Sequence, residues 1–131
     1  MYIRFITQFI NEDGENETGF FHALRYLCEY PLTNDEDVRD LKALNKWFNN
    51  NLDRPTKFSN ATNKNPAPIS LSWFKDTAKE HLRKTNEIMK ILEKYDMVIE
   101  RFTSKNPGYI IYEDDYQVSA IPFKSDKNKV L

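Results

Sequence analysis

Hydroxyl, cationic and aromatic side chains gather between residues 54 and 75, and their chemistry suits an anion. The six candidates are Arg54, Lys57, Ser70, Ser72, Trp73 and Lys75. The first turn of a helix presents unpaired amides, and serine hydroxyls and basic side chains strengthen their attraction for negative charge. If a helix begins at Ser70 or Ser72, the pattern predicts a phosphate-like or carboxylate ligand at its start. The alternative is a solvated basic loop, because no glycine-rich phosphate loop is present.

Two further groups have suitable residue types but unsuitable spacing. A thiol nucleophile would need Cys28 beside His22 or His81, yet Cys28 falls on the apolar stripe of a predicted helix, where thiols are inert. Neither histidine belongs to a motif with metal-ligand spacing, so we predict no metal and no cofactor. The acidic run 113–115 has oxygen ligands for a cation, but aspartates in that setting are typical of a tight turn.

A second candidate site is the outward face of the predicted sheet. Its members are Arg4, Gln8, Arg101, Tyr112 and Gln117. Arginine and tyrosine on an exposed sheet face favour contact with another protein or with a second copy of the chain. The aromatic motifs of RNA-binding sheets are missing, so nucleic acid is the weaker alternative. A simply hydrated face is the other alternative.

Hydrophobic periodicity predicts the elements that must position these residues. We expect strands over residues 2–10, 97–103, 109–113 and 116–120, and helices over 18–30, 33–52 and 70–95. Thr33 and Glu36 have the spacing of a capping box, which places the start of the second helix at Thr33. Leu82 and Ile88 lie in the middle of the third helix's apolar stripe, so both are expected to be buried.

The composition fits one packed domain. A chain of 131 residues with 40% hydrophobic residues can form a core without a metal or a disulfide. The expected fold class is α+β: an antiparallel sheet of about four strands with three helices packed on one face. Residues 1–123 should form a single α+β domain in which the first and last strands meet, and 124–131 a flexible C-terminal tail.

Charge and cysteine content indicate the compartment and the partners. A formal net charge of -1 gives no overall field that would attract nucleic acid or an anionic membrane. No apolar run reaches the roughly 20 residues of a membrane span, and the pattern of the first residues leads us to expect no signal peptide. Cys28 is the single cysteine, which fits a reducing cytoplasm.

Three short segments carry a family resemblance. They are the runs 73–78 (WFKDTA), 107–109 (PGY) and 112–118 (YEDDYQV). They resemble a family of small uncharacterised bacterial proteins with no assigned function, and the resemblance implies no catalytic or binding residue. We therefore expect a small intracellular interaction or binding protein without catalysis. The alternative is a ligand sensor or enzyme that binds an anionic small molecule at the start of the third helix.

Overall fold

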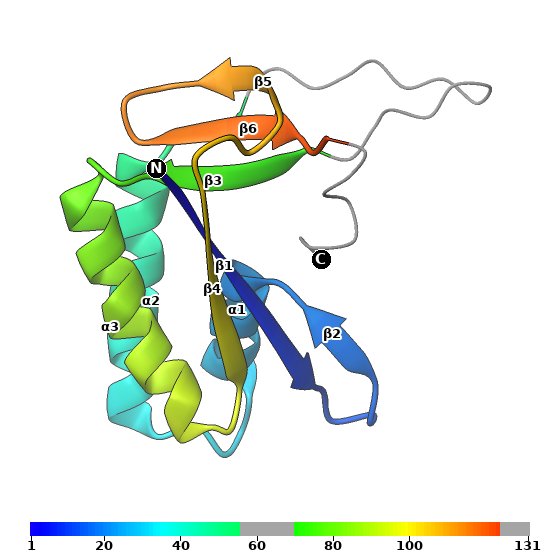
Figure 1. Ribbon diagram of the computed structural model, residues 1–131. Helices are drawn as coiled ribbons and strands as arrows, with labels where there is room; N and C mark the ends of the chain where they lie inside the picture. The colour runs from blue at the N-terminus through cyan, green and yellow to red at the C-terminus, as the bar shows by residue number, and fades with distance from the viewer. Residues whose placement is uncertain (56–69, 124–131) are drawn as a thin grey trace. The chain divides into compact units, whose positions relative to one another are not determined.

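The computed structural model describes residues 1–55 and 70–123 (Figure 1). The predicted tail 124–131 and the anion candidate Lys57 therefore lie outside the described residues. In chain order the elements are β1 (Tyr2–Ile10), β2 (Asn16–Thr18), α1 (Phe20–Glu29), α2 (Asp35–Asn51), β3 (Leu71–Lys75), α3 (Lys79–Lys94), β4 (Val98–Ser104), β5 (Tyr109–Glu113) and β6 (Gln117–Ile121). None of these helices is both long and apolar enough to span a membrane.

The predicted α+β class is confirmed, with three helices and an antiparallel sheet in the described residues. The sheet has six strands rather than about four, in the order β2-β1-β3-β6-β5, with β4 pairing β1. The additional strands are β2 and β3. Because β3 pairs with both β1 and β6, the expectation that the first and last strands meet was wrong.

The chain divides into two compact units. Unit 1 comprises Met1–Arg4, Asp53–Lys79 and Phe102–Leu131, and unit 2 comprises Phe5–Leu52 and Glu80–Arg101. Within the described residues, unit 1 therefore holds β3, β5, β6 and the beginning of β1. Unit 2 holds the three helices, apart from the first residue of α3, with β2 and the remainder of β1.

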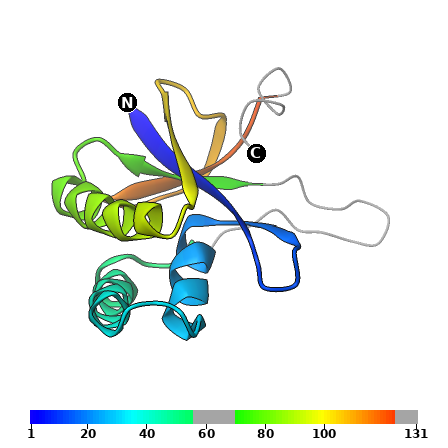
Figure 2. The same ribbon diagram turned by 90° about the horizontal axis from the view of Figure 1, so that it is seen from below.

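Unit 2 has an aliphatic core between its helices and β1. Figure 2 shows the three helices together on one side of β1. Alternate residues of β1 point inward, and Phe5 and Phe9 contact rings of α1. Five large aliphatic side chains have at most 1% of their surface exposed: Leu24, Leu27, Leu41, Ile88 and Leu92. The apolar spacing of α1, α2 and α3 thus buries one stripe of each helix.

Unit 1 is a sheet in which β3 lies between β1 and β6, and β5 forms the end (Figure 1). Val118 and Ala120 of β6 are completely buried, and their partners on β3 are Trp73 and Leu71. Gly108 precedes β5 with φ 132°, and a Cβ there would overlap the Ile121 carbonyl group. This close approach of two backbones needs glycine.

The third helix begins nine residues after Ser70, at Lys79, so its predicted start was wrong. Residues 71–75 form a strand because two neighbours distant in the sequence, β1 and β6, supply its hydrogen bonds. The buried face of α3 also differs from the prediction. Ile88 is buried as expected, whereas Leu82 is half-exposed and His81 takes the inward position.

The cap of α2 lies one residue after the predicted position. Asn34 is the N-cap, and its Oδ1 accepts a hydrogen bond from the Glu36 amide at 2.8 Å. Thr33 is buried and its hydroxyl group has no partner within the described residues, so it does not form the expected capping box. Asparagine caps a helix as well as threonine does, and local chain geometry decides between the two neighbours.

Candidate functional site

The strand β3 separates the residues that were expected to bind an anion at a helix start. Ser72, Trp73 and Lys75 are strand residues, so they present no free helical amides. Ser70 directly precedes the strand and is half-buried, while Arg54 is exposed. The predicted helix-start geometry is therefore absent at these residues.

Two of these β3 residues are already engaged by other side chains in unit 1. The Ser72 hydroxyl is hydrogen bonded to that of Ser119 at 3.0 Å. The Nζ of Lys75 lies 2.6 Å from Glu113 Oε2. That hydrogen bond holds the pKa of Lys75 above its ordinary value. The charge of Lys75 is thus largely compensated within the chain.

Arg4 and Trp73 contain polar groups that lack partners in the part of the chain that the structure describes. The Arg4 Nη1 donates to the Ser72 carbonyl at 2.9 Å, at the point where β1 stops pairing with β3. The Nε of Arg4 and the Nε1 of Trp73 are buried and have no hydrogen-bond partner among residues 1–55 and 70–123. Burial lowers the pKa of the Arg4 guanidinium, which nevertheless stays charged.

The turn between β5 and β6 is held by Asp114. Its Oδ1 accepts from the amides of Tyr116 and Gln117, and its Oδ2 accepts from the Tyr112 hydroxyl and the Gln117 amide group. Burial alone would raise the pKa of Asp114, but together these hydrogen bonds outweigh it and the pKa is lowered. The carboxylate is thus committed to the turn, as the turn interpretation of the acidic run predicts.

The predicted interaction face is divided by these contacts. Gln117 is buried, with 4% of its surface exposed, and donates to the Asp53 carbonyl group, so its expected outward position was wrong. Tyr112 and Arg4 are half-buried and bonded within unit 1. Gln8 and Arg101 are exposed and belong to unit 2.

The end strand β5 is the most exposed apolar segment of unit 1. Tyr109 and Ile110 have 65% and 44% of their surface exposed. In the sheet order of the described chain, β5 follows β6 and no further strand pairs with it. Its register against β6 shifts between Ile110 and Tyr112, which marks a β-bulge. The sequence does contain a signal for this apolar edge. The run 109–112 carries no charge and lies between a Pro-Gly turn and an acidic turn.

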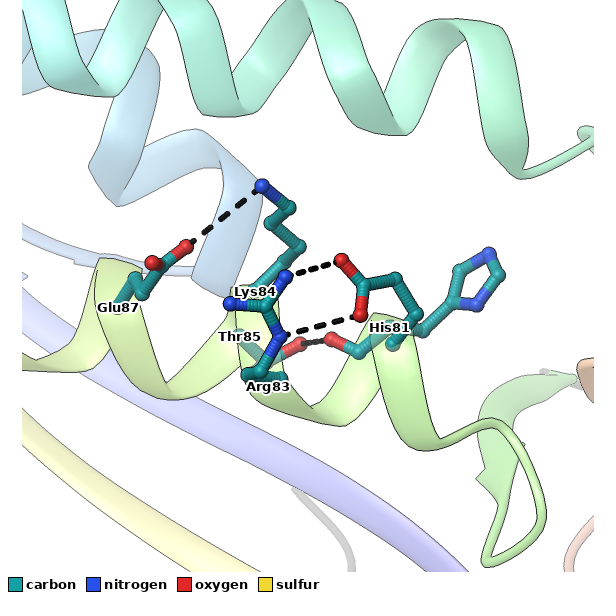
Figure 3. Close-up of polar contacts among 6 residues, drawn as sticks. His81, Arg83, Lys84, Thr85 and Glu87 are labelled. Atoms are coloured by element: carbon teal, nitrogen blue, oxygen red, sulfur yellow. Dashed lines mark hydrogen bonds and ion pairs between the residues drawn. The ribbon is translucent and has the colours of Figure 1, made fainter.

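Polar side chains of α3 form a separate group on the surface of unit 2 (Figure 3). Arg83 donates to both carboxylate oxygens of Glu80. The Nζ of Lys84 lies 3.9 Å from Oε2 of Glu87. The Lys84 Nζ also lies 5.6 Å from the centre of the Trp47 ring. Pairs of this kind on one helix surface add little stability and form no enclosed site.

The residues considered for nucleophilic or metal chemistry have structural partners. His81 is buried, and its Nε2 donates to the Asn51 carbonyl group at 2.7 Å, which links α3 to the end of α2. His22 pairs with Glu17 at 3.0 Å. Burial raises the pKa of the Cys28 thiol, the opposite of an activated thiolate. No group of three metal-ligating side chains occurs in residues 1–55 and 70–123.

Comparison of the chain with protein-family models, curated proteins and solved structures finds no match. The resemblance to small bacterial proteins therefore stays a prediction. Function has to be inferred from the two features of unit 1 that its internal contacts leave unused. These are the exposed strand β5 and the donors of Arg4 and Trp73 that have no partner in the described residues.

Proposed function

We propose that this chain is a non-catalytic interaction module that binds an extended apolar segment of a partner protein along the edge of β5. The observation that carries the proposal is the exposure of Tyr109 and Ile110 on an end strand of the described sheet. Strand addition uses the unpaired backbone groups of such an edge for affinity and neighbouring side chains for specificity.

The charges on β5 support an uncharged partner segment. Glu113 is the one charged residue in the strand, and it is paired with Lys75. Natural edge strands usually avoid pairing by carrying charged side chains that stay free in water. Because the charge of β5 is compensated, the strand repels neither sign of charge and favours a segment rich in β-branched or aromatic residues.

The bulge disfavours the symmetric pairing of β5 with a second copy of the chain that is centred on Ile111. Tyr109 and Tyr112 pair with Ile121 and Ser119 and therefore share one face, whereas Ile110 pairs with Ala120 on the other face. Residues directly opposite each other in an antiparallel pair share a face. A symmetric pair centred on Ile111 would place Ile110 opposite Tyr112, which violates this rule.

The test uses a synthetic peptide of alternating valine and threonine as the probe. Amide hydrogen exchange of the full chain should slow in β5 when the peptide is added. Ile110→Lys, which puts a charge at the edge, should abolish this protection. Leu32→Lys is the matched control, because Leu32 is 77% exposed but belongs to unit 2. Equal protection in Ile110→Lys, protection of amides elsewhere, or no protection in the wild-type chain would contradict the proposal.

A further inference from the structure

Arg4 and Trp73 occupy neighbouring positions on one face of the sheet in unit 1. The pairing of β1 with β3 sets Tyr2 opposite Lys75 and Ile3 opposite Phe74. Arg4 lies two residues after Tyr2 on β1, and Trp73 lies two residues before Lys75 on β3. Because side chains alternate along a strand, Arg4 and Trp73 share the face that carries Tyr2 and Lys75. The two side chains therefore project from adjacent strands to the same side.

Each of these side chains carries an N–H donor that the described chain leaves unused. Trp73 has 4% of its surface exposed, and its Nε1 is buried without a hydrogen-bond partner. The Nε of Arg4 is buried without a partner as well, although its Nη1 reaches the Ser72 carbonyl. Buried donors are nearly always paired, because an unmade hydrogen bond costs the full desolvation of the group.

The charge of Arg4 is also uncompensated within the described residues. No carboxylate in residues 1–55 and 70–123 lies within ion-pair distance of its guanidinium. Lys75 on the same face has Glu113, so the two cations differ in this respect. Because burial removes part of the hydration of this guanidinium, an anion close to it would be stabilising.

We infer that Arg4 and Trp73 form part of a binding site for an oxyanion, the carboxylate or phosphate group of a ligand. One ligand oxygen accepts from the indole N–H and another from the Arg4 Nε–H, which is the charge-assisted geometry that guanidinium groups favour. This site is separate from the proposed binding edge at β5, because the strand β6 lies between β3 and β5 in the sheet. The two proposals can therefore fail independently.

The experiment follows the side-chain N–H signals of the full chain, labelled with ¹⁵N, during titration with inorganic phosphate and with acetate. Ionic strength is held constant with chloride. The indole signal of Trp73 and the Nε–H signal of Arg4 should shift together and saturate. The indole signal of Trp47, which lies in unit 2, should stay in place. A stronger response to phosphate than to acetate, or the reverse, identifies the ligand group.

Two variants make the test specific. Trp73→Phe removes the indole donor and keeps an aromatic ring, and it also assigns the indole signal. Arg4→Lys keeps the charge and removes the Nε–H donor. It should weaken the binding of the anion about tenfold. Trp47→Phe is the matched control and should bind as the wild type does. If the Trp73 signal does not move in the wild-type chain, moves without saturating, or moves equally in Arg4→Lys, the inference fails and an ordered water is the acceptor.

Discussion

The two units of this chain are stabilised by different kinds of interaction. In unit 2 the completely buried side chains are mostly large and aliphatic, as Leu41, Ile88 and Leu92 illustrate. In unit 1 the most buried residues of β6 are Val118, Ser119 and Ala120, which are small. Unit 1 also buries the larger Ile3 and Trp73, and strand pairing, the Asp114 turn and close backbone approach add to the stability that this apolar area provides.

Both candidate sites lie in unit 1, where the unpaired groups are N–H donors and a strand edge. Aliphatic side chains carry no hydrogen-bond donors or acceptors, so their burial leaves no polar group without a partner. A sheet with buried polar groups has directional requirements, and any group left without a partner remains available to a ligand. In unit 1 these are the donors of Arg4 and Trp73 and the edge of β5. In unit 2 the buried His81 is bonded to Asn51, but the buried hydroxyl groups of Thr7 and Thr33 also have no partner among the described residues.

The largest expected effect is a cavity in the core of unit 2. Ile88→Ala should reduce the free energy of unfolding by about 2–5 kcal/mol, because Ile88 is completely buried and the helices collapse only partly around the gap. Urea denaturation measures this loss. The matched variant in unit 1 is Val118→Ala, which removes fewer buried carbons and should cost about 2 kcal/mol. A greater loss for Val118→Ala would break the comparison between the units.

The stability of unit 1 should be sensitive to the close approach of the backbone at Gly108 to the backbone at Ile121. Gly108→Ala should cost about 3 kcal/mol, because the new Cβ overlaps the Ile121 carbonyl group and φ is 132°. The matched control is Gly14→Ala in unit 2, where φ is 79° and no atom lies within 4 Å of the new Cβ. That variant should cost about 1 kcal/mol in a thermal melt. Equal losses would show that the close approach contributes nothing.

A smaller effect is expected at the ion pair that joins α2 to the end of α3. Asp37 accepts from the Tyr95 hydroxyl at 2.7 Å and from Lys94 at 3.0 Å, and these hydrogen bonds lower the pKa of Asp37. The stabilisation is therefore present above the ordinary pKa of about 3.9 and is lost as the pH falls through the lower folded value.

Asp37→Asn tests this pH dependence. At pH 7 the variant should be less stable than the wild type by about 1–2 kcal/mol, because a charge-assisted hydrogen bond is weakened. The difference should shrink as the pH falls below about 4, where the wild-type carboxyl group takes up its proton. Stability curves measured by urea at several pH values provide the check, and a difference that grows on acidification would refute the assignment.

The smallest effect is expected on the exposed face of α3. Arg83→Gln removes the pair with Glu80, in which both side chains are at least half-exposed. The loss of free energy of unfolding should be the smallest of this series and should vanish at high salt, because solvent and ions screen an exposed pair. Denaturation at low and high ionic strength measures it. A loss that persists in high salt would indicate that Arg83 contributes through packing and not through charge.

Local patterns determined much of unit 2 and the turn of unit 1. The apolar spacing in residues 18–30 and 33–52 predicts α1 and α2, and alternation in residues 2–10 predicts β1. The Asp114 turn was likewise predictable, because an aspartate side chain bonds amides two and three residues later whatever surrounds it. Among the site residues, Tyr112 was correctly predicted to lie on a strand. The hydrogen bond from its hydroxyl group to Asp114, which holds Tyr112 in its half-buried position, was not predicted.

The sequence by itself determined the elements whose stabilising contacts lie within a few residues, and tertiary structure decided the rest. The segment 71–75 has apolar spacing that fits a helix or a strand, and it became β3 because β1 and β6 pair with it from far away in the sequence. That pairing buried Trp73 and Gln117, gave Lys75 to Glu113 and left Arg4 without an acid in the described chain. Long-range hydrogen bonds and ion pairs have no local signature, which is why the anion and interaction residues had to be regrouped by the fold.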